Sequence, residues 1–326
     1  MCKNRSISLQ EEGKSFVQDD SYCRDFAVIQ LQSGPPQLIV CVCIINVILS
    51  IASGIANTLV ISVIWKTPAL RSPSMVLLSG LATADLAVAV VAQPLFLAIK
   101  MKILLTSSES DTCDLGMIFG ITLYVTNGAS LMTVTAISLD RLLAIRYDLR
   151  YPSIVTIPRV IYAISLSWLI SGFLATLFLW TGYDTYLIVT LCGIAICFSF
   201  CKITHLRIYR IVCRHQRQIQ MQVEAVQEGN RSQMARFKKT TVNAFLIHYC
   251  LLLCYTPLIT LKALISRFKG SLEFESWYRY HGPIAWNLSV IFLFMNSSLN
   301  PLIYCWRLRE MRLAVKGTLK SVLCKN

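Results

Sequence analysis

Residues 74–99 read SMVLLSGLATADLAVAVVAQPLFLAI, an apolar run in which Asp85 is the single charged residue. A helix needs about 20 mostly apolar residues to cross a bilayer, so this run predicts a membrane span. Six more mostly apolar runs lie near residues 38–64, 115–143, 159–180, 185–209, 240–265 and 283–305. The pattern predicts an all-α fold, a bundle of seven transmembrane helices.

The composition excludes most other classes of protein. Of the 326 residues, 15% are charged, against about 25% in a typical soluble domain, and the mean hydropathy is +0.57. The net charge of +14 does not predict a nucleic-acid partner, because the basic residues stand in short stretches between apolar runs. The four histidines are scattered and no nucleophile motif is present, so we expect no enzymatic activity and no required cofactor.

The basic residues orient the chain, because cytoplasmic loops carry an excess of lysine and arginine. We expect residues 1–37 to be an extracellular segment and residues 38–305 to form the bundle in the plasma membrane. Residues 306–326 are expected to form a cytoplasmic amphipathic helix and tail that lie against membrane lipid. Asn4 begins a glycosylation sequon on the outer side. Cys324 is a candidate for palmitoylation, with an unmodified cysteine as the alternative.

Short motifs occur in order along the spans. They are Gly54-Ile55-Ala56-Asn57, Leu81-Ala82-Thr83-Ala84-Asp85, Asp140-Arg141-Leu142, Trp168, Cys254-Tyr255-Thr256-Pro257 and Asn300-Pro301-Leu302-Ile303-Tyr304. Each motif is weak alone, but the ordered set resembles the rhodopsin-like (class A) G-protein-coupled receptors over all seven spans. The resemblance implies a receptor that converts binding of an extracellular ligand into activation of a heterotrimeric G protein. The alternative is a seven-span transporter or channel, although the chain shows no internal repeat.

The resemblance implies an activation switch near the cytoplasmic side. Asp140 would restrain Arg141 at rest, and Arg141 would turn toward the G protein on activation. The alternative is an arginine that only reaches for lipid headgroups. Phe237 stands where an acid could latch Arg141 to the sixth span, so we expect basal activity. The other implied switch residues, which include two helix-kinking prolines, are Leu149, Tyr255, Pro257, Asn300, Pro301 and Tyr304.

A charged residue in mid-membrane is expensive and marks a candidate functional site. The resemblance places Asp85 in a polar cluster that holds an allosteric sodium ion. Oxygen ligands suit such a hard cation, and no other metal is expected. The alternative is a protonated Asp85 that is hydrogen-bonded to Asn57 and Asn300. The matching positions all carry oxygen: Asp85, Ser130, Asn296, Ser297 and Asn300.

Three features differ from the usual class A pattern and indicate which receptors of the class this chain resembles most in architecture. The connection after the fourth span, about residues 180–185, is short and lacks cysteine, and the fifth span lacks proline. These features resemble the architecture of melanocortin, lysophospholipid, cannabinoid and adenosine receptors. The charged residues with which melanocortin and lysophospholipid receptors bind their ligands are nevertheless absent from this sequence. The usual disulfide to that loop cannot form, so Cys23 is the implied partner of Cys113, with a free thiol as the alternative.

The outward half of the spans supplies a candidate ligand pocket, in which a few polar residues stand among apolar ones. Lys262 could attract a carboxylate or phosphate, but we expect it to reach the outer surface instead. Leu123 stands where amine receptors carry an aspartate, which argues against a biogenic amine. The sequence names neither the ligand nor the G-protein subtype. The predicted pocket residues are Gln93, Leu123, Tyr124, Asn127, Tyr255, Lys262, Trp286 and Asn287.

Overall fold

The computed structural model describes residues 34–106, 113–222, 228–268 and 270–323, and these ranges contain helices and no strand. Within these ranges, seven helices are long and apolar enough to cross a membrane, as predicted. The elements are α2 (Pro36–Lys66), η1 (Pro68–Leu70), α3 (Pro73–Ala87), η2 (Val88–Ala92), α4 (Gln93–Thr106), α5 (Cys113–Tyr147), η4 (Asp148–Arg150), α6 (Tyr151–Ile154), α7 (Ile157–Thr176), α8 (Phe178–Thr181), α9 (Tyr183–Gln222), α10 (Glu228–Phe268), α11 (Leu272–Arg307) and α12 (Arg309–Leu323).

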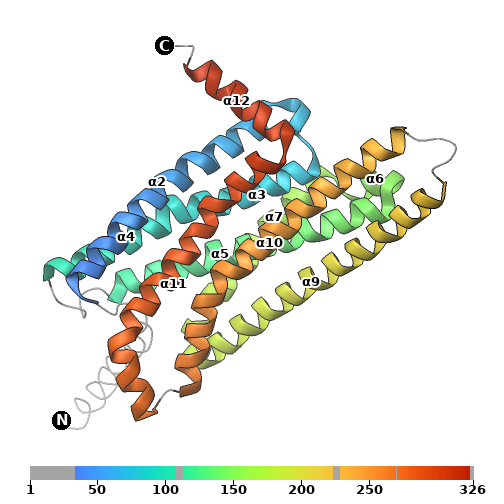
Figure 1. Ribbon diagram of the computed structural model, residues 1–326. Helices are drawn as coiled ribbons and strands as arrows, with labels where there is room; N and C mark the ends of the chain where they lie inside the picture. Colours follow the sequence, from blue (N-terminus) through green and yellow to red (C-terminus); the bar gives the residue numbers. More distant parts are fainter. Residues whose placement is uncertain (1–33, 107–112, 223–227, 269, 324–326) are drawn as a thin grey trace, which may run out of the picture.

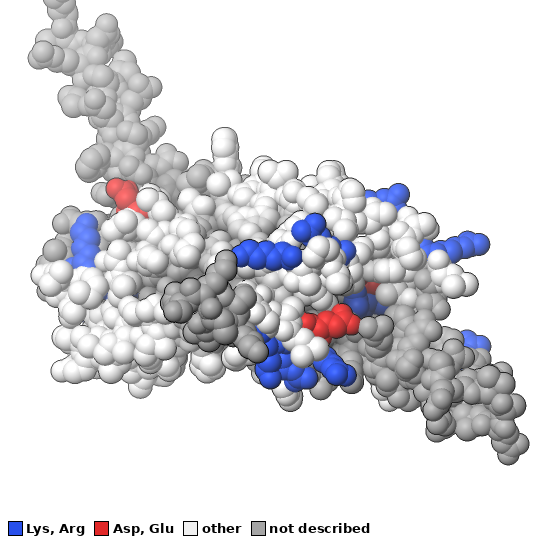
Figure 2. Space-filling model, turned by 90° about the horizontal axis from the view of Figure 1, so that it is seen from above, with Lys and Arg blue, Asp and Glu red and all other residues white. Residues whose placement is uncertain are grey.

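The helices form one elongated bundle in which α5 is central (Figure 1). It packs against α3, α7, α9 and α10, while α11 packs against α10 and α2. Large apolar side chains are exposed on the outer faces of several helices, for example Ile48, Leu169 and Ile196. Figure 2 shows uncharged atoms over most of one face, with lysines and arginines in separate groups. Such a surface fits hydrocarbon rather than water.

The second span is continuous through α3, η2 and α4, and η2 is a π-helical turn. Pro94 lies just beyond this turn and has no backbone N–H to donate. Before the proline, the backbone hydrogen bonds therefore span five residues instead of four, as in a π-helix. Local π-helical turns of this kind are tolerated in membrane helices. The turn changes which side chains of α4 face the bundle.

The last span begins earlier than the sequence predicted. The apolar run starts near residue 283, but α11 begins at Leu272, after Gly270 with its positive φ of 89°. Its first turns carry Glu273 and Glu275 and are therefore not hydrophobic enough to be read as membrane-spanning. The helix contains Pro283 and Pro301, and α10 contains Pro257, so the two predicted kink prolines both lie inside helices.

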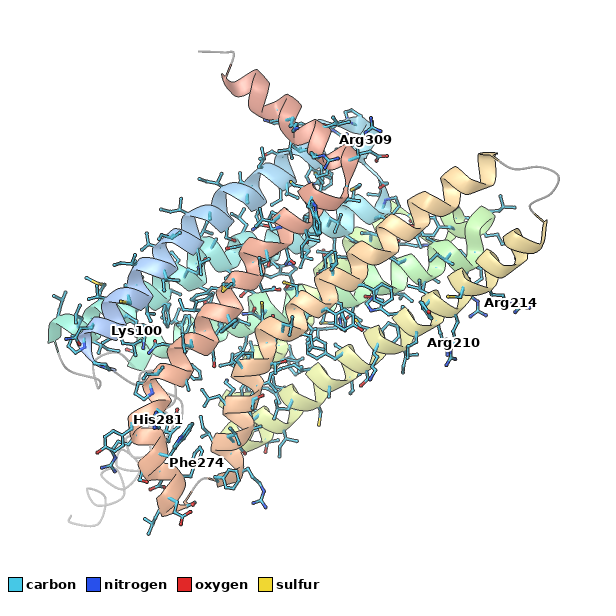
Figure 3. All side chains as sticks on the ribbon, in the orientation of Figure 1. Lys100, Arg210, Arg214, Phe274, His281 and Arg309 are labelled. Atoms are coloured by element: carbon cyan, nitrogen blue, oxygen red, sulfur yellow. The ribbon has the colours of Figure 1, made fainter. Side chains whose placement is uncertain are left out.

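The helix after the bundle is amphipathic, as predicted. In α12, Met311 and Val315 are buried against α2 and α11, whereas Arg309, Arg312 and Lys316 are exposed. Figure 3 places Arg309 toward the same end of the bundle as Arg210 and Arg214 of α9, and Phe274 and His281 toward the other end. We call the first the Arg141 end, because Arg141 lies in the last turns of α5 there, and the second the opposite end.

Candidate functional site

A hydrogen-bonded network surrounds Asp140 at the Arg141 end. The Tyr151 hydroxyl donates to Asp140 Oδ1 at 2.6 Å, and the Ser74 hydroxyl donates to Oδ2 at 2.9 Å. Arg141 Nε donates to the same Oδ2 at 3.0 Å, and its Nη2 completes an ion pair. Asp140 is 3% exposed. The carboxylate therefore has donors from α3, α5 and α6, which fix Arg141 against its own helix.

Tyr151 acts in this network as a neutral donor. Burial, together with the negative charge of Asp140, raises the pKa of the Tyr151 phenol to about 12. The hydroxyl therefore keeps its proton over the physiological pH range and donates a hydrogen bond to the carboxylate. Neither Tyr151 nor Ser74 was among the predicted switch residues, because contacts across 11 and 66 residues leave no local signal in the sequence.

A second buried carboxylate, Asp85, lies in mid-bundle on α3. Asn300 Nδ2 of α11 donates to Asp85 Oδ2 at 2.8 Å, and Ser297 also hydrogen-bonds to Asp85. The predicted bond from Asn57 is absent from the described structure, since Asn57 Nδ2 donates to Ser53 and to the Ser297 carbonyl at 3.0 Å. The structure thus joins three of the motif helices, α2, α3 and α11, at one place.

Several buried oxygens of the predicted sodium-site residues, and one of Asn57, have no hydrogen-bond partner within the described protein. They are Oδ1 of Asp85, Oδ1 of Asn57, Oγ of Ser130 and Oδ1 of Asn296 and Asn300. Buried polar atoms are normally satisfied, and unpaired oxygen acceptors are the ligands that a hard cation requires. The residues therefore fit a sodium ion chemically. No cluster of three or more His, Cys, Asp or Glu that could hold another metal occurs among the described residues.

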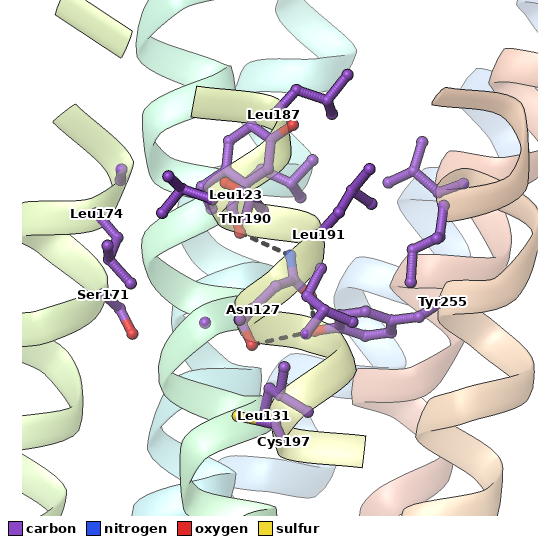
Figure 4. Close-up of a pocket in the computed structure, with 18 of the residues that line it drawn as sticks. Leu123, Asn127, Leu131, Ser171, Leu174, Leu187, Thr190, Leu191, Cys197 and Tyr255 are labelled. Atoms are coloured by element: carbon purple, nitrogen blue, oxygen red, sulfur yellow. Dashed lines mark hydrogen bonds between the residues drawn. The ribbon is translucent and has the colours of Figure 1, made fainter. Parts of the chain in front are cut away.

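A hydrogen bond joins α10 to α5 one turn from its kink proline. The Tyr255 hydroxyl donates to Asn127 Oδ1 at 2.7 Å and lies 3.1 Å from the Asn127 carbonyl oxygen (Figure 4). Both residues are buried. Tyr255 lies two residues before Pro257, so a displacement at this bond acts on the segment of α10 that the proline leaves least constrained.

A cavity of about 300 Å³ lies beside this bond, between α5, α7, α9, α10 and α11 (Figure 4). Most of its lining is apolar, from Leu131 and Met132 near the middle of the bundle to Leu187 toward the opposite end. Six of the eight predicted pocket residues line it: Leu123, Tyr124, Asn127, Tyr255, Lys262 and Trp286. Gln93 and Asn287 are buried elsewhere and do not line this cavity.

Lys262 is buried, so the expectation that it reaches the surface was wrong. It is 7% exposed, its Nζ contacts the Tyr124 hydroxyl, and the ammonium lies 4.5 Å from the centre of the Tyr124 ring. The apolar stem of a lysine often extends to water, but here Lys262 faces the cavity. The side chain is oriented by packing against α5 and α11, which the α10 sequence does not specify.

The other predicted site residues lie as follows. Leu149 is 94% exposed in η4, which leaves its side chain free to contact another protein. Tyr304 is fully buried in α11, three residues after Pro301. Asn4, Cys23 and Cys324 lie outside the described residues, as do the side chains of Cys113 and Phe237, so glycosylation, the disulfide and palmitoylation stay predictions.

Comparisons with known proteins agree with this architecture. Residues 56–186 match the model of the 7 transmembrane receptor (rhodopsin family). The chain is 24% identical to the bovine (Bos taurus) adenosine receptor A2b and 26% identical to the human (Homo sapiens) melanocortin receptor 3. These alignments cover 85% of this chain in both cases and 89% and 83% of the relatives.

A solved structure shares the fold. The crystal structure of squid rhodopsin superimposes with a TM-score of 0.73 and 19% identity, over 90% of this chain and 88% of that one. The resemblance predicted from the motifs is therefore confirmed, including its placement near the adenosine and melanocortin receptors. The chain is a multi-pass membrane protein.

Proposed function

As a relative of the rhodopsin-like receptors, this chain is, we propose, a plasma-membrane receptor that couples binding of an extracellular ligand to activation of a heterotrimeric G protein. The Arg141 end would face the cytoplasm and the opposite end the exterior, following the distribution of basic residues. The observation that carries the proposal is Arg141, a single arginine restrained by the buried Asp140 at the end from which the basic helices extend.

Activation in this proposal is a movement of α10 relative to α5. A ligand in the cavity would contact Tyr255 and Asn127 directly, since both line it. Breaking or strengthening their 2.7 Å bond would bias the kinked segment around Pro257. The cytoplasmic part of α10 would then swing outward and Arg141 would leave Asp140 to meet the G protein. Two discrete packings of one helix are the usual form of such a switch.

We also propose that the receptor has basal activity. The described restraints on Arg141 come from Asp140, which Ser74 and Tyr151 hold in place. These residues belong to α3, α5 and α6, so this network does not tie Arg141 to α10. At the base of the sixth span the sequence offers Arg236 and Phe237 rather than an acid. In this proposal a minor active population needs no broken bond between Arg141 and α10.

A sodium ion would stabilise the inactive packing. The residues that would hold it are Asp85, Ser130 and Asn300, together with the oxygens of Asn296 and Ser297. When bound, the cation would neutralise the buried carboxylate and satisfy the unpaired acceptors around it. Because these residues come from α3, α5 and α11, the ion would favour the arrangement in which the three helices stay together.

The first test is basal second-messenger output in cells that express the chain or its Arg141→Ala variant at matched surface level. We expect output above that of untransfected cells and its loss in the variant. Arg146→Ala is the matched control, because Arg146 is exposed one turn beyond and makes no contact with Asp140 in the described structure. Equal output from wild type and Arg141→Ala would contradict the proposal and favour a membrane protein of another kind.

A further inference from the structure

The cavity has a polar end and an apolar end. Lys262 and Tyr124 lie toward the opposite end of the bundle, and Leu131, Met132 and Cys197 line the deeper part. Tyr255 and Lys262 are separated by two helical turns of α10, about 10 Å along the axis. A volume of about 300 Å³ is at the lower limit for small-ligand sites. A mostly apolar space of this size, lined along α5 from Tyr124 to Met132, favours an extended chain over a folded peptide.

The polar end carries hydrogen-bond donors with too few acceptors. The Lys262 ammonium donates to the Tyr124 hydroxyl, and it lies 5.9 Å from the ring of Trp286. Trp286 Nε1 is buried and has no hydrogen-bond partner within the described protein. Two donors, one of them charged, therefore converge from α10 and α11 on the same end of the cavity. An indole N–H and an ammonium both require an acceptor when water is excluded.

Among the acids whose side chains the structure describes, no carboxylate supplies that acceptor. The ion pair that the structure shows is that of Arg141 with Asp140, at the far end of the bundle. The described acids toward the opposite end, Asp114, Glu273 and Glu275, are all exposed. Leaving a cation buried and unpaired is costly, so an anionic group of a ligand fits this position.

The apolar part of the cavity reaches the lipid-facing surface. Leu174 of α7 and Val189 and Ile196 of α9 line the cavity, and Ile196 is 68% exposed. Both α7 and α9 pack on α5, but they make few direct contacts with each other in the described structure. A ligand dissolved in the bilayer could therefore enter between these two helices without crossing the polar end.

We infer that the cavity binds an amphiphile with one anionic headgroup, a carboxylate or a phosphate, and a long aliphatic chain, which enters from the membrane between α7 and α9. The headgroup would accept from Lys262 and Trp286, and the chain would fill the space along Leu131 and Met132. The inference rests on the proposed receptor function only in naming this cavity as the ligand site. Binding itself requires no G protein.

The test is direct binding to the full chain in nanodiscs of uncharged lipid, without G protein. The probes share an 18-carbon monounsaturated chain and differ in the headgroup: oleate, oleyl phosphate, oleyl alcohol and oleylamine. We expect one or both anions to bind about tenfold or more tightly than the alcohol, and the amine to bind most weakly. The preferred anion separates a fatty-acid-like from a phospholipid-like ligand.

Two variants locate the site. Lys262→Gln should bring anion affinity down to that of oleyl alcohol and leave the alcohol unchanged, whereas Lys66→Gln, an exposed lysine on α2, should change neither. Gly193→Leu should abolish binding of all chain probes, because Gly193 lines the cavity and an added Cβ there meets nothing within 4 Å. Gly172→Leu is its control, since Gly172 of α7 has equal space but does not line the cavity.

Equal binding of oleate and oleyl alcohol, an unchanged preference in Lys262→Gln, or no binding of any probe to folded protein would overturn the inference. Folding of each variant is checked by thermal unfolding in the same nanodiscs. The binding test and the signalling test can also give different answers. If the chain binds the anions as expected but Arg141→Ala signals as well as wild type, the ligand class is supported and the receptor mechanism is refuted. The two failures are therefore distinguishable.

Discussion

Asp140 and Asp85 are both buried, but they differ in their hydrogen-bond partners and in whether a cationic side chain pairs with them. Asp140, at the Arg141 end, accepts from Tyr151, Ser74 and Arg141, and its charge is neutralised within the chain. Asp85, in mid-bundle, accepts from Asn300 and Ser297, and no cationic side chain pairs with it in the described structure. Its Oδ1 has no partner within the described protein, and neither do the side-chain oxygens of several other predicted sodium-site residues.

The hydrogen-bond partners of each aspartate indicate the role for which it is suited. A carboxylate whose partners all belong to the protein is a latch, because opening it costs hydrogen bonds that only a new partner can replace. A carboxylate with an unpaired oxygen, bonded to an amide whose own oxygen is also unpaired, is incomplete, because such oxygens favour a bound cation. The first is suited to hold a switch closed, and the second to report on an ion. Each prediction below alters one of the two.

The largest effect is expected from Asp140→Asn. The amide removes the charge that pairs with Arg141, and a hydrogen bond to a charged group contributes about 1.5–3 kcal/mol. Basal G-protein activation should therefore rise by about tenfold or more. Second-messenger output at matched surface level measures it, with Asp114→Asn, an exposed acid at the start of α5, as control. Unchanged or lower output with normal surface expression would show that Asp140 is not the latch.

A smaller change is expected from Tyr151→Phe, which removes one donor and leaves the ion pair intact. The bonds from Ser74 and Arg141 to Asp140 remain, so we expect only part of the roughly 1.5–3 kcal/mol of a hydrogen bond to a charged group to be lost. A loss of about 1 kcal/mol would raise basal output by about fivefold. The raised pKa of Tyr151, about 12, keeps the donor present at pH 7 to 9, and the effect should be the same across that range. Tyr162→Phe, an exposed tyrosine of α7, is the control. A loss of basal output in Tyr151→Phe would assign the hydroxyl to the active state instead.

How far the sequence anticipates these sites depends on what each one requires. The spans, Asp85 and Asp140-Arg141 follow from hydropathy and from short motifs, and apart from the start of α11 the seven candidate membrane spans lie close to the predicted runs. The start of α11 at Leu272 was missed because its first turns are polar. Ser74 and Tyr151 were missed because their contact with Asp140 depends on how α3 and α6 pack on α5.

Lys262 was identified from the sequence, but the direction of its side chain was predicted wrongly. Its position near the end of an apolar run favours a lysine that extends to water, and only the packed bundle turns it toward Tyr124. The polar cluster around Asp85 was easier to anticipate, since every one of its members carries oxygen and stands in a span. Residue type and depth are visible in a sequence, whereas the direction of a side chain is decided by neighbouring helices.

The smallest effect is expected at Asp85. Wild-type protein should be stabilised by sodium relative to choline, by about 1 kcal/mol at roughly five times the dissociation constant. Asp85→Asn should abolish the difference, because the amide removes the charge and one oxygen ligand. Thermal unfolding in the two chloride salts measures it, and Asp114→Asn should keep the full response. A sodium response that survives Asp85→Asn would place the ion elsewhere.

The most direct measurement of the central claim is nucleotide exchange on purified heterotrimeric G proteins of each subtype, catalysed by the chain in nanodiscs without added ligand. We predict that at least one subtype exchanges faster with the wild-type chain, faster still with Asp140→Asn, and at the uncatalysed rate with Arg141→Ala. Exchange with none of the subtypes, or equal exchange by wild type and Arg141→Ala, would contradict the assignment of Arg141 and Asp140 as a G-protein switch.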